Sequence, residues 1–362
     1  MWRVSVIDGT HTGMDGMRSM VQSGQAPVPG ERPTLKTIAF MTGLGVTTVS
    51  RALKDAPDIS QETKERVRLV ATQIGYHPNR AGVRLRTGKT NVISLILNID
   101  EELMGLTSHI VYGISEVLAS TNYHLIVTPY SRDRDPMTPV RYILDSGSAD
   151  GVILSSMEPE DPRVKLLLER NLPFATHGRT ELGIPHPFHD FDNQAYAYDA
   201  VRRLAGRGRR HLAILEPLPR FTFFHHMHAG YLAGLRDFGC ERVPFREATV
   251  HDPLQVVYDA AMNLLRDHPE TDGIICGSSS GAVAISSAIA ATGRQVGRDI
   301  DLVSKQPADL LRFIRPEVMT VDEDIRLAGR ELAKAVLGRI EGIAPEQLQS
   351  ICMPDGRLVV PH

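Results

Sequence analysis

The 362-residue sequence contains little cysteine, few aromatic residues and no long apolar run. Its three cysteines, Cys240, Cys276 and Cys352, lie far apart, and none belongs to the CxxC pair of a zinc or redox site. Sparse, odd-numbered thiols are typical of a reducing cytoplasm, where cysteine serves as a small core residue. We therefore expect no metal site and no cofactor.

Apolar runs stay shorter than the roughly 18 residues that cross a bilayer. The first 30 residues also lack the continuous apolar core of a secretory signal. We expect a cytoplasmic protein with no membrane partner. Residues 1–30 are rich in Gly, Ser and Met, which indicates either a disordered arm or an extension from a misassigned start.

Charge is distributed unevenly along the chain. Residues 31–90 hold eleven Lys and Arg against five Asp and Glu, whereas residues 91–362 hold 27 against 36. A small basic segment in front of a large acidic one indicates an anionic partner for the N-terminal segment. The alternative is a chance distribution of surface charge.

Residues 31–77 predict three short helices, at Leu35–Met41, Val46–Leu53 and Gln61–Ile74. Thr34 and Ser60 are expected to cap the first and third helices, because their hydroxyls can accept orphan backbone N–H groups. Gly43 can adopt the positive φ of the turn between the first two. Two helices joined by a tight glycine turn predict a helix-turn-helix, whose second helix enters the DNA major groove.

The expected base contacts lie at the start and on the outer face of the second helix: Val46, Thr47, Ser50 and Arg51. Arg51 can bond bidentately to guanine, and Val or Thr methyl groups can touch a thymine methyl. Thr48 and Ser50 can instead bind phosphates, which fix register without recognising sequence. In the alternative, a three-helix bundle without a DNA role, this polar face and Lys54 are ordinary solvated surface.

Residues 78–90 form a second basic segment. Asn79 can cap a short helix in which one leucine, Leu85, lies among Arg80, Arg84 and Arg86. Helices below roughly 12 residues are marginal alone, so this one is expected to form when its charges meet phosphates. Leu85 can then enter the minor groove and kink a base step. The alternative is a basic linker whose leucine packs on the next domain.

Two stretches, TLKTIAFMTGLGVTTVSRALK (34–54) and DISQETKERVRLVATQIGYHPNRAGVRLRTGKT (58–90), resemble the DNA-binding head and hinge of the LacI family. The resemblance implies a homodimer on double-stranded operator DNA, a hinge helix at 78–90 and Leu85 as its wedge. It also adds expected DNA contacts, at Thr34, Leu35, Tyr76, Asn79 and Arg80. The sequence departs from the family at Gly45, usually Ser, and Lys54, usually Asn, which alters the expected operator preference.

Residues 91–362 alternate short apolar runs with helix-like stretches. The expected strands are Val92–Leu97, His124–Thr128, Gly151–Ser155, Phe174–Thr176, Leu212–Leu215, Gly273–Cys276 and Asp301–Ser304. The helix-like stretches include Val111–Leu118, Pro162–Arg170, Gln194–Leu204 and Val283–Ala291. This alternation predicts parallel sheets covered on both faces. Because the segment exceeds the usual size of one domain, we expect an α/β fold of two doubly wound lobes with a ligand cleft between them.

The motifs DFDN (190–193), GRGRRHLAIL (206–215) and AGYLAGL (229–235), with the apolar period of 326–342, resemble the periplasmic-binding-protein-like sensing domain of the same family. The resemblance implies effector binding and dimerisation by residues 91–362. It also implies a transcriptional repressor whose operator binding is controlled by a carbohydrate-like effector in the cleft.

Three positions that usually bind sugar in the family are altered. Ser278 and Ser279 replace its Asn-Asp pair, Met227 replaces an arginine, and residues 304–307 (SKQP) replace Gly-Phe-Asp-Asp. A carboxylate pair suits a ligand with many hydroxyls, so its loss favours a different or less hydroxylated effector.

Arg179, at the end of a predicted strand, is the principal expected effector contact, because a guanidinium can clamp a carboxylate or phosphate. The weaker candidates are Ser155, Asp192, His226, Ser279 and Gln306. Asp192 either accepts bonds from ligand hydroxyls or caps the following helix. Residues 225–228 (HHMH) have no metal-binding spacing and are expected in a loop or on a lobe surface.

The run at 277–281 (GSSSG) can bind a phosphate at a helix N-terminus, but it lacks the Gly-Lys-Ser/Thr ending of a P-loop. We expect an effector with a carboxylate, a phosphate or several hydroxyls.

An enzyme is the competing class of protein, yet no GxSxG elbow, Walker motif or dinucleotide fingerprint follows a predicted strand, where each would have to lie. A solute-binding protein is the third class, and the basic N-terminal segment argues against it.

Overall fold

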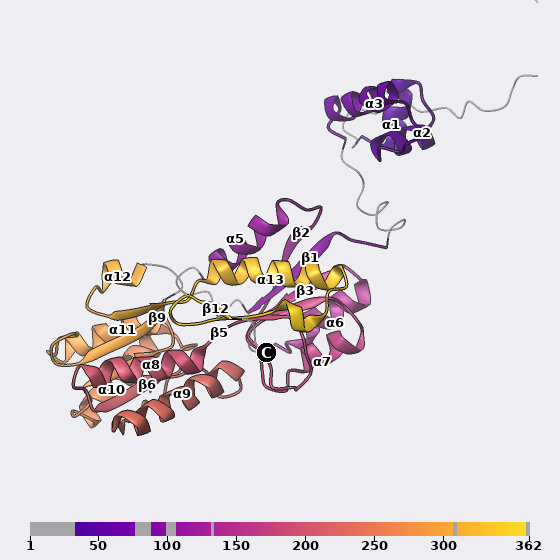
Figure 1. The fold of residues 1–362 in the computed structure, drawn as a ribbon. Coiled ribbons are helices and arrows are strands. Elements are labelled where there is room, and N and C mark those ends of the chain that lie inside the picture. Colours follow the sequence, from indigo (N-terminus) through magenta and orange to yellow (C-terminus); the bar gives the residue numbers. More distant parts are fainter. Residues whose placement is uncertain (1–32, 77–87, 99–105, 132–133, 307–309, 360–362) are drawn as a thin grey trace, which may run out of the picture. The chain divides into compact units, whose positions relative to one another are not determined.

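The computed structural model describes residues 33–76, 88–98, 106–131, 134–306 and 310–359 (Figure 1). Contacts within the chain divide it into two compact units, residues 1–88 and residues 89–362. We call them the head and the sensing unit. Within the described ranges, no helix is long and apolar enough to cross a membrane.

Three helices form the head: α1 (Leu35–Thr42), α2 (Val46–Leu53) and α3 (Gln61–Gln73). Thr34 caps α1 by accepting a bond from the Thr37 backbone, and Ser60 caps α3 by accepting one from Thr63. Gly43 has a φ of 68° at the end of α1. The predicted three-helix head is therefore confirmed.

The head encloses a small core to which every helix contributes. Ile38 from α1, Val49 and Ala52 from α2, and Val67 from α3 are fully buried. Because Val49 and Ala52 lie on one side of α2, its other side is left at the surface. At its N-terminus, Gly45 supplies no side-chain cap, as expected for a residue without a side-chain acceptor.

The first lobe of the sensing unit contains a seven-stranded sheet in the order β12-β11-β5-β4-β3-β1-β2. Its strands are β1 (Val92–Asn98), β2 (His124–Tyr130), β3 (Gly151–Leu154), β4 (Phe174–His177), β5 (Phe188–Phe191), β11 (Gln349–Cys352) and β12 (Leu358–Val359). All neighbours pair in parallel except β11 and β12. β2 is an edge strand.

The first lobe's helices are α5 (Leu106–Leu118), α6 (Met137–Ser146), α7 (Pro162–Glu169) and α13 (Ile325–Ile340). A 3-10 turn at Pro345–Leu348 follows α13. Helices α5 and α13 pack closely against each other at Gly113. A Cβ at this position would lie 2.0 Å from the Arg326 carbonyl oxygen, so only glycine allows this approach. α13 thus belongs to the first lobe although it follows the second lobe in sequence (Figure 1).

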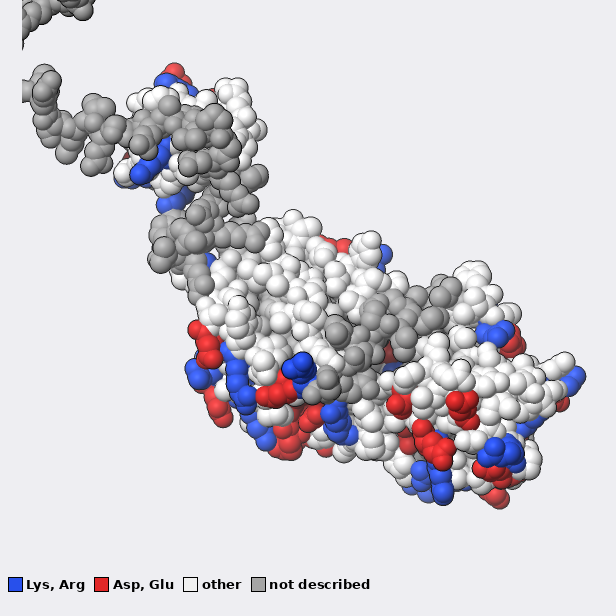
Figure 2. All heavy atoms as spheres, turned by 180° about the vertical axis from the view of Figure 1, so that it is seen from behind, with Lys and Arg blue, Asp and Glu red and all other residues white. Residues whose placement is uncertain are grey.

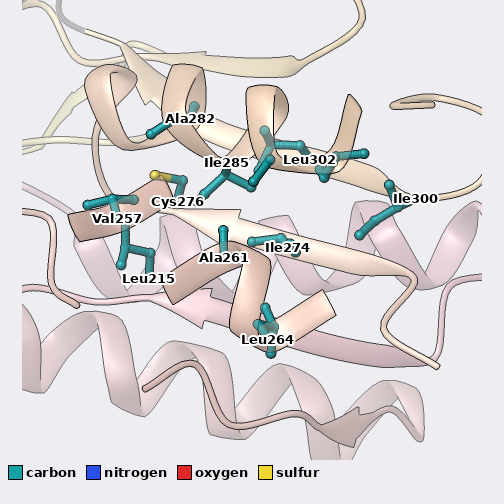
Figure 3. Packing of buried hydrophobic residues seen from close by; sticks show 14 of the residues in the cluster. Leu215, Val257, Ala261, Leu264, Ile274, Cys276, Ala282, Ile285, Ile300 and Leu302 are labelled. Atoms are coloured by element: carbon teal, nitrogen blue, oxygen red, sulfur yellow. The ribbon is translucent and has the colours of Figure 1, made fainter. Parts of the chain in front are cut away.

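The second lobe contains a five-stranded parallel sheet in the order β10-β9-β8-β6-β7. Its strands are β6 (His211–Leu215), β7 (Glu241–Arg242), β8 (Gly273–Cys276), β9 (Asp301–Gln306) and β10 (Met319–Asp322). Its helices are α8 (Asn193–Gly206), α9 (Thr222–Phe238), α10 (Leu254–Asp267), α11 (Ser279–Ala291) and α12 (Leu310–Ile314). Figure 3 shows α10 and α11 packing on β6 and β8 through Leu215, Ala261, Ile274 and Ile285.

The chain crosses between lobes at two places. It passes from β5 to α8 through Asp192, and from β10 to α13 through Glu323 and Asp324. The first crossing is tied to the sheet of the first lobe, because the Asp192 N–H donates to the Cys352 carbonyl at 2.9 Å. The fold is that of two doubly wound lobes, as the alternating pattern predicted.

Every strand predicted for residues 91–362 is present, with end shifts of a few residues. Five further strands were not predicted from the sequence: β5, β7, β10, β11 and β12. β5 (FHDF) alternates apolar and polar residues although all four are buried, so it shows no continuous apolar run. Residues 225–228 were expected in a loop or on a lobe surface; they lie in the first turns of α9, where His225 is exposed and Met227 is buried.

Candidate DNA-binding surface and effector pocket

The predicted base-contacting residues of α2 lie at its surface. Val46, Thr47 and Arg51 are exposed, while Thr48 and Ser50 are half-buried. Lys54, the C-cap of α2, is also exposed. One helix therefore presents an aliphatic group, hydroxyls and a guanidinium side by side, which are the groups that recognise base edges and phosphates.

Arg51 has a partner that the sequence analysis did not anticipate. Its Nη2 lies 2.5 Å from the Asp58 carboxylate, and both side chains are about half-exposed. Asp55, in the same loop, pairs with Lys64 at 3.2 Å and Arg68 at 2.8 Å. These contacts lower the pKa of Asp55, chiefly through Lys64, and attach the loop to α3.

The remaining residues predicted to contact DNA differ in their packing and hydrogen bonds. Thr34 forms a capping box with Thr37, and Leu35 packs partly into the head core. Tyr76 also packs against that core, and burial raises its pKa. Asn79, Arg80 and Leu85 lie outside the described residues.

A pocket opens in the sensing unit where both sheets end. Its walls include residues directly after or at the ends of β3, β4, β8 and β9: Ser155, His177, Gly277 and Lys305. Thr222 and Phe223, at the start of α9, complete the wall from the second lobe. The carboxyl ends of parallel strands converge here, as expected for a ligand site in doubly wound sheets.

Arg179 lines this pocket and has a carboxylate neighbour. Its Nε lies 2.9 Å from Oδ2 of Asp190, whose side chain is nearly buried. Burial raises the pKa of Asp190 to about 6, although Arg179 and the Phe191 backbone N–H counteract the rise. The guanidinium is therefore partly neutralised within the pocket.

Lys305 is a second cation of the pocket, and the sequence analysis missed it as a site residue. Its Nζ lies 2.8 Å from the Asn193 amide oxygen and 2.9 Å from a Glu323 carboxylate oxygen. It also lies 5.1 Å from the centre of the Phe191 ring. The pocket therefore holds a cation besides Arg179. From the sequence, Lys305 was noted only as part of the altered stretch at residues 304–307, and no motif marked it as a site residue.

Lys305 also joins both crossings between the lobes. Asn193 begins α8 after the first crossing, and Glu323 lies in the second. The lysine itself belongs to β9 of the second lobe and is nearly buried. A ligand that touches it would meet the point at which both crossings are held.

Two buried hydroxyls of the pocket have no hydrogen-bond partner among the described residues: those of Ser155 and Thr222. Each residue is at least nine-tenths buried, and unpaired buried polar atoms are costly. Phe223 and His251 supply aromatic surface beside them, with ring centres 5.9 Å apart. The pocket thus combines unused hydroxyls with an aromatic wall.

Three predicted effector residues lie away from the pocket wall. Asp192 caps α8 by accepting from the Ala195 N–H at 2.8 Å, and lines a neighbouring groove with Arg179. Gln306 is buried and donates to Asp322 at 2.6 Å. His226 is on α9, where burial, with Arg179 nearby, lowers its pKa to about 4.

Ser279 does line the pocket, but its hydroxyl donates to the Lys305 carbonyl at 3.0 Å. Its neighbour Ser278 caps α11 by accepting from the Gly281 N–H. Met227, at the position of the family's arginine, is fully buried in the core of the second lobe and brings no polar group to the site.

Two neighbouring histidines, His177 on the pocket wall and His189 beside it, have lowered pKa values. Burial lowers the pKa of His177, and it lowers that of His189 to about 3. The two rings stack with centres 6.5 Å apart. In the described part of the chain, no group of three or more His, Cys, Asp or Glu could hold a metal ion.

Two family models match the chain. Residues 34–79 match the bacterial regulatory proteins of the lacI family, and residues 91–353 match the periplasmic binding proteins and sugar binding domain of the LacI family. The first match contains α1, α2 and α3, and the second spans the pocket.

The HTH-type transcriptional regulator AglR of Rhizobium meliloti (strain 1021) is 32% identical over 86% of this chain and 90% of that protein. RafR of Escherichia coli, another such regulator, is 30% identical over 89% and 96%. The fold is similar to that of the lac repressor dimer bound to operator and the anti-inducer ONPF, with a TM-score of 0.76, 21% identity and coverage of 87% and 94%. It is also similar to the CelR–cellobiose complex, with a TM-score of 0.62, 24% identity and coverage of 91% and 99%. These relatives are transcriptional regulators rather than enzymes, and the chain belongs to the LacI family of DNA-binding transcriptional regulators.

Proposed function

We propose that this regulator is a repressor that binds a near-palindromic operator as a homodimer and responds to a neutral, hydroxyl-rich effector, a sugar or short oligosaccharide, in the pocket of the sensing unit. As a regulator of transcription, it acts in the cytoplasm. The charge balance of the pocket is the observation that carries the effector class.

Each cation of the pocket has its own carboxylate. Arg179 lies against Asp190, and Lys305 lies against Glu323. An anionic effector would have to displace or repel a carboxylate in a half-closed, poorly solvated space, where such interactions are strong. A neutral ligand leaves both pairs intact, so the pocket favours hydroxyls over a carboxylate or phosphate.

The unpaired hydroxyls support the same class. Ser155 and Thr222 can each donate to and accept from a ligand hydroxyl, and binding would relieve the cost of leaving them unpaired. Phe223 offers an aromatic face for the C–H groups of a sugar ring. The relative crystallised as a CelR–cellobiose complex carries a disaccharide, which agrees with this proposal.

On the DNA side, the exposed face of α2 supports major-groove binding by Val46, Thr47 and Arg51, with Thr48, Ser50 and Lys54 on phosphates. Asn79, Arg80 and Leu85 remain proposed hinge contacts. On the face of the sensing unit seen in Figure 2, acidic and basic side chains are interspersed. That face offers no continuous basic surface for a polyanion.

A homodimer supplies two copies of α2 for two half-sites. The sensing unit exposes apolar side chains around its edge strand β2, namely Ile126 and Val127 on β2 and Tyr112 on α5. An exposed apolar edge strand is unfavourable in a monomer. We propose this region as part of the dimer surface.

The test pairs neutral sugars with their acids. Thermal-shift titrations of the full chain would compare maltose with maltobionate and cellobiose with cellobionate, with raffinose as a longer neutral ligand. A ligand present at 100 times its Kd stabilises a protein by about 2.7 kcal/mol, so a neutral binder should raise Tm by several degrees. Binding of the acids alone would contradict the proposed effector class.

A pair of variants then locates the effector. Thr222→Val removes one unpaired hydroxyl and keeps the volume of the side chain, so it should weaken the sugar-induced Tm shift without altering DNA binding. Thr180→Val, which removes a hydroxyl outside the pocket wall, is the matched control. Equal sugar-induced shifts in the two variants would contradict the pocket assignment.

A further inference from the structure

We propose that Asp58 is a positioning residue for DNA recognition: it orients Arg51 toward one base pair, and it sharpens sequence discrimination at the expense of overall DNA affinity. This inference rests on the proposed function of α2. Asp58 lies beyond the C-terminus of α2, in the loop before α3, and no DNA-binding role was expected for it.

The contact leaves most of the guanidinium available. Asp58 lies 2.5 Å from Nη2 of Arg51, and the Arg51 side chain is still 53% exposed. Arginine has five N–H donors in a rigid plane, so one carboxylate contact leaves a donor pair for guanine O6 and N7. A guanidinium held in its plane loses less rotational freedom on binding than a free one.

Hydrogen bonds and ion pairs hold the loop that carries Asp58. The Ala56 N–H donates to the Arg51 carbonyl at 3.1 Å, and the Ile59 N–H donates to the Ala56 carbonyl at 3.2 Å. Asp55 pairs with Lys64 and Arg68 of α3. Backbone bonds to α2 on one side and ion pairs to α3 on the other therefore hold Asp58 at a set distance from Arg51.

The negative charge of Asp58 explains the expected loss of overall DNA affinity. A phosphate backbone that approaches α2 meets a half-exposed carboxylate, which repels any duplex regardless of sequence. A carboxylate on a DNA-binding surface lowers non-specific affinity, and its ion pair with Arg51 favours the orientation that faces a base over a swing toward a phosphate. Both effects increase the ratio of specific to non-specific binding.

The experiment uses the full chain and an operator selected from a random duplex library. Anisotropy titrations at fixed salt would measure Kd for the operator, for its three substitutions at the base pair that Arg51→Ala identifies, and for a scrambled duplex. The variants are Asp58→Asn and Asp58→Ser. Glu62→Gln, an exposed carboxylate on α3 without an ion pair among the described residues, is the charge-matched control.

We expect Asp58→Asn and Asp58→Ser to bind the scrambled duplex more tightly and to lose about three- to tenfold of the discrimination at that one base pair. Glu62→Gln should keep the wild-type discrimination. In Arg51→Ala, adding Asp58→Asn should cause no further loss of discrimination. Thermal unfolding of each variant provides the check for a purely structural role, which would lower Tm and leave the ratio of Kd values unchanged.

Wild-type discrimination in both Asp58 variants would overturn the inference while leaving the proposed function intact. So would an equal loss in Glu62→Gln, because it would assign the effect to net charge alone. If the wild type itself prefers no selected duplex over the scrambled one, the proposed function fails first, and this inference fails with it.

Discussion

The two candidate sites of this molecule are built in opposite ways. The candidate DNA-binding surface comes from one eight-residue helix, α2, and the loop that follows it. The effector pocket draws its walls from both sheets, from Leu97 at the end of β1 to Glu323 after β10. A surface made of neighbours in sequence depends on local helix formation, whereas a pocket made of distant segments depends on the packing of a whole unit.

Because of this difference, a substitution can disrupt one site and leave the other intact. A substitution in the sensing unit can remove the pocket and leave α2 unchanged, because the head has its own core. A substitution on the exposed side of α2 changes the proposed DNA contacts without removing a buried group.

The largest expected effect follows from Asp161→Ala. Asp161 is fully buried beside Arg163, with 2.7 Å between the carboxylate and Nη2. Removing one partner of a buried ion pair leaves an uncompensated charge and costs about 3–5 kcal/mol. Chemical denaturation should show this loss in the sensing unit, while the helical signal of the head persists.

The adjacent pair provides the control. Glu160 and Lys165 lie 2.6 Å apart but are well exposed, and exposed pairs contribute about 0–1 kcal/mol. Glu160→Ala should therefore change the free energy of unfolding little. If Asp161→Ala abolished the fold of the head as well, the two units would not be independent, and the comparison would be wrong.

Asp190→Asn should alter the pH dependence of stability. The folded-state pKa of Asp190 is raised to about 6, so folding disfavours its ionised form, and wild-type stability falls as pH rises from about 4 to 6. One pKa unit corresponds to about 1.4 kcal/mol, so the variant should be more stable than wild type above pH 6 by roughly 1–3 kcal/mol. Below about pH 4 the two curves should meet.

Denaturant titrations of both proteins between pH 4 and 8 measure this difference directly. Taking the difference cancels the opposite contribution of His189, whose pKa is lowered to about 3. A constant difference across the range would show that Asp190 keeps an ordinary pKa beside Arg179, and that the pocket is better solvated than its burial indicates.

Arg51→Ala tests the candidate DNA-binding surface, which is built from residues close together in the sequence. If Arg51 bonds to guanine, the change should cost about 1–3 kcal/mol of operator affinity and relax the preference at one base pair. The sensing unit should keep its sugar response. Kd values for operator and substituted duplexes provide the measurement, and a loss shared by every sequence would make Arg51 a phosphate contact.

Lys54→Ala should give the smallest effect. A phosphate contact weakens all sequences alike and reduces the slope of log K against log salt by about one. Titrations at several salt concentrations would show it. An unchanged slope would remove Lys54 from the DNA surface.

The contrast between a surface of sequence neighbours and a pocket of distant segments also explains how much of each site could be predicted from the sequence. Caps at Thr34 and Ser60, the turn at Gly43 and the bounds of α2 follow from neighbouring residues, and all are present in the structure. Even on this side, Asp58 was missed, because its contact with Arg51 depends on how the loop folds back toward α2.

In the pocket, position at a strand end or a helix start located Ser155, Arg179 and Ser279, but it did not reveal the partners of Arg179 and Ser279. The pairings of Arg179 with Asp190 and of Lys305 with Glu323 join residues from different strands and crossings. Gln306 satisfied the strand-end rule and yet turns to Asp322, since the rule gives the edge of the sheet and not the direction of a side chain. Ion pairs between distant segments can be predicted only when the fold that brings those segments together is known.

The most direct test of the account is the affinity of the best sugar from the thermal-shift panel, measured by calorimetry on the full chain with and without saturating operator. If the sugar releases the repressor from DNA, operator must weaken sugar binding by the same factor by which sugar weakens operator binding. Coupling free energies of about 1–3 kcal/mol predict a 5- to 150-fold change. Equal sugar affinity in the two states would contradict the claim that the pocket controls the DNA-binding surface.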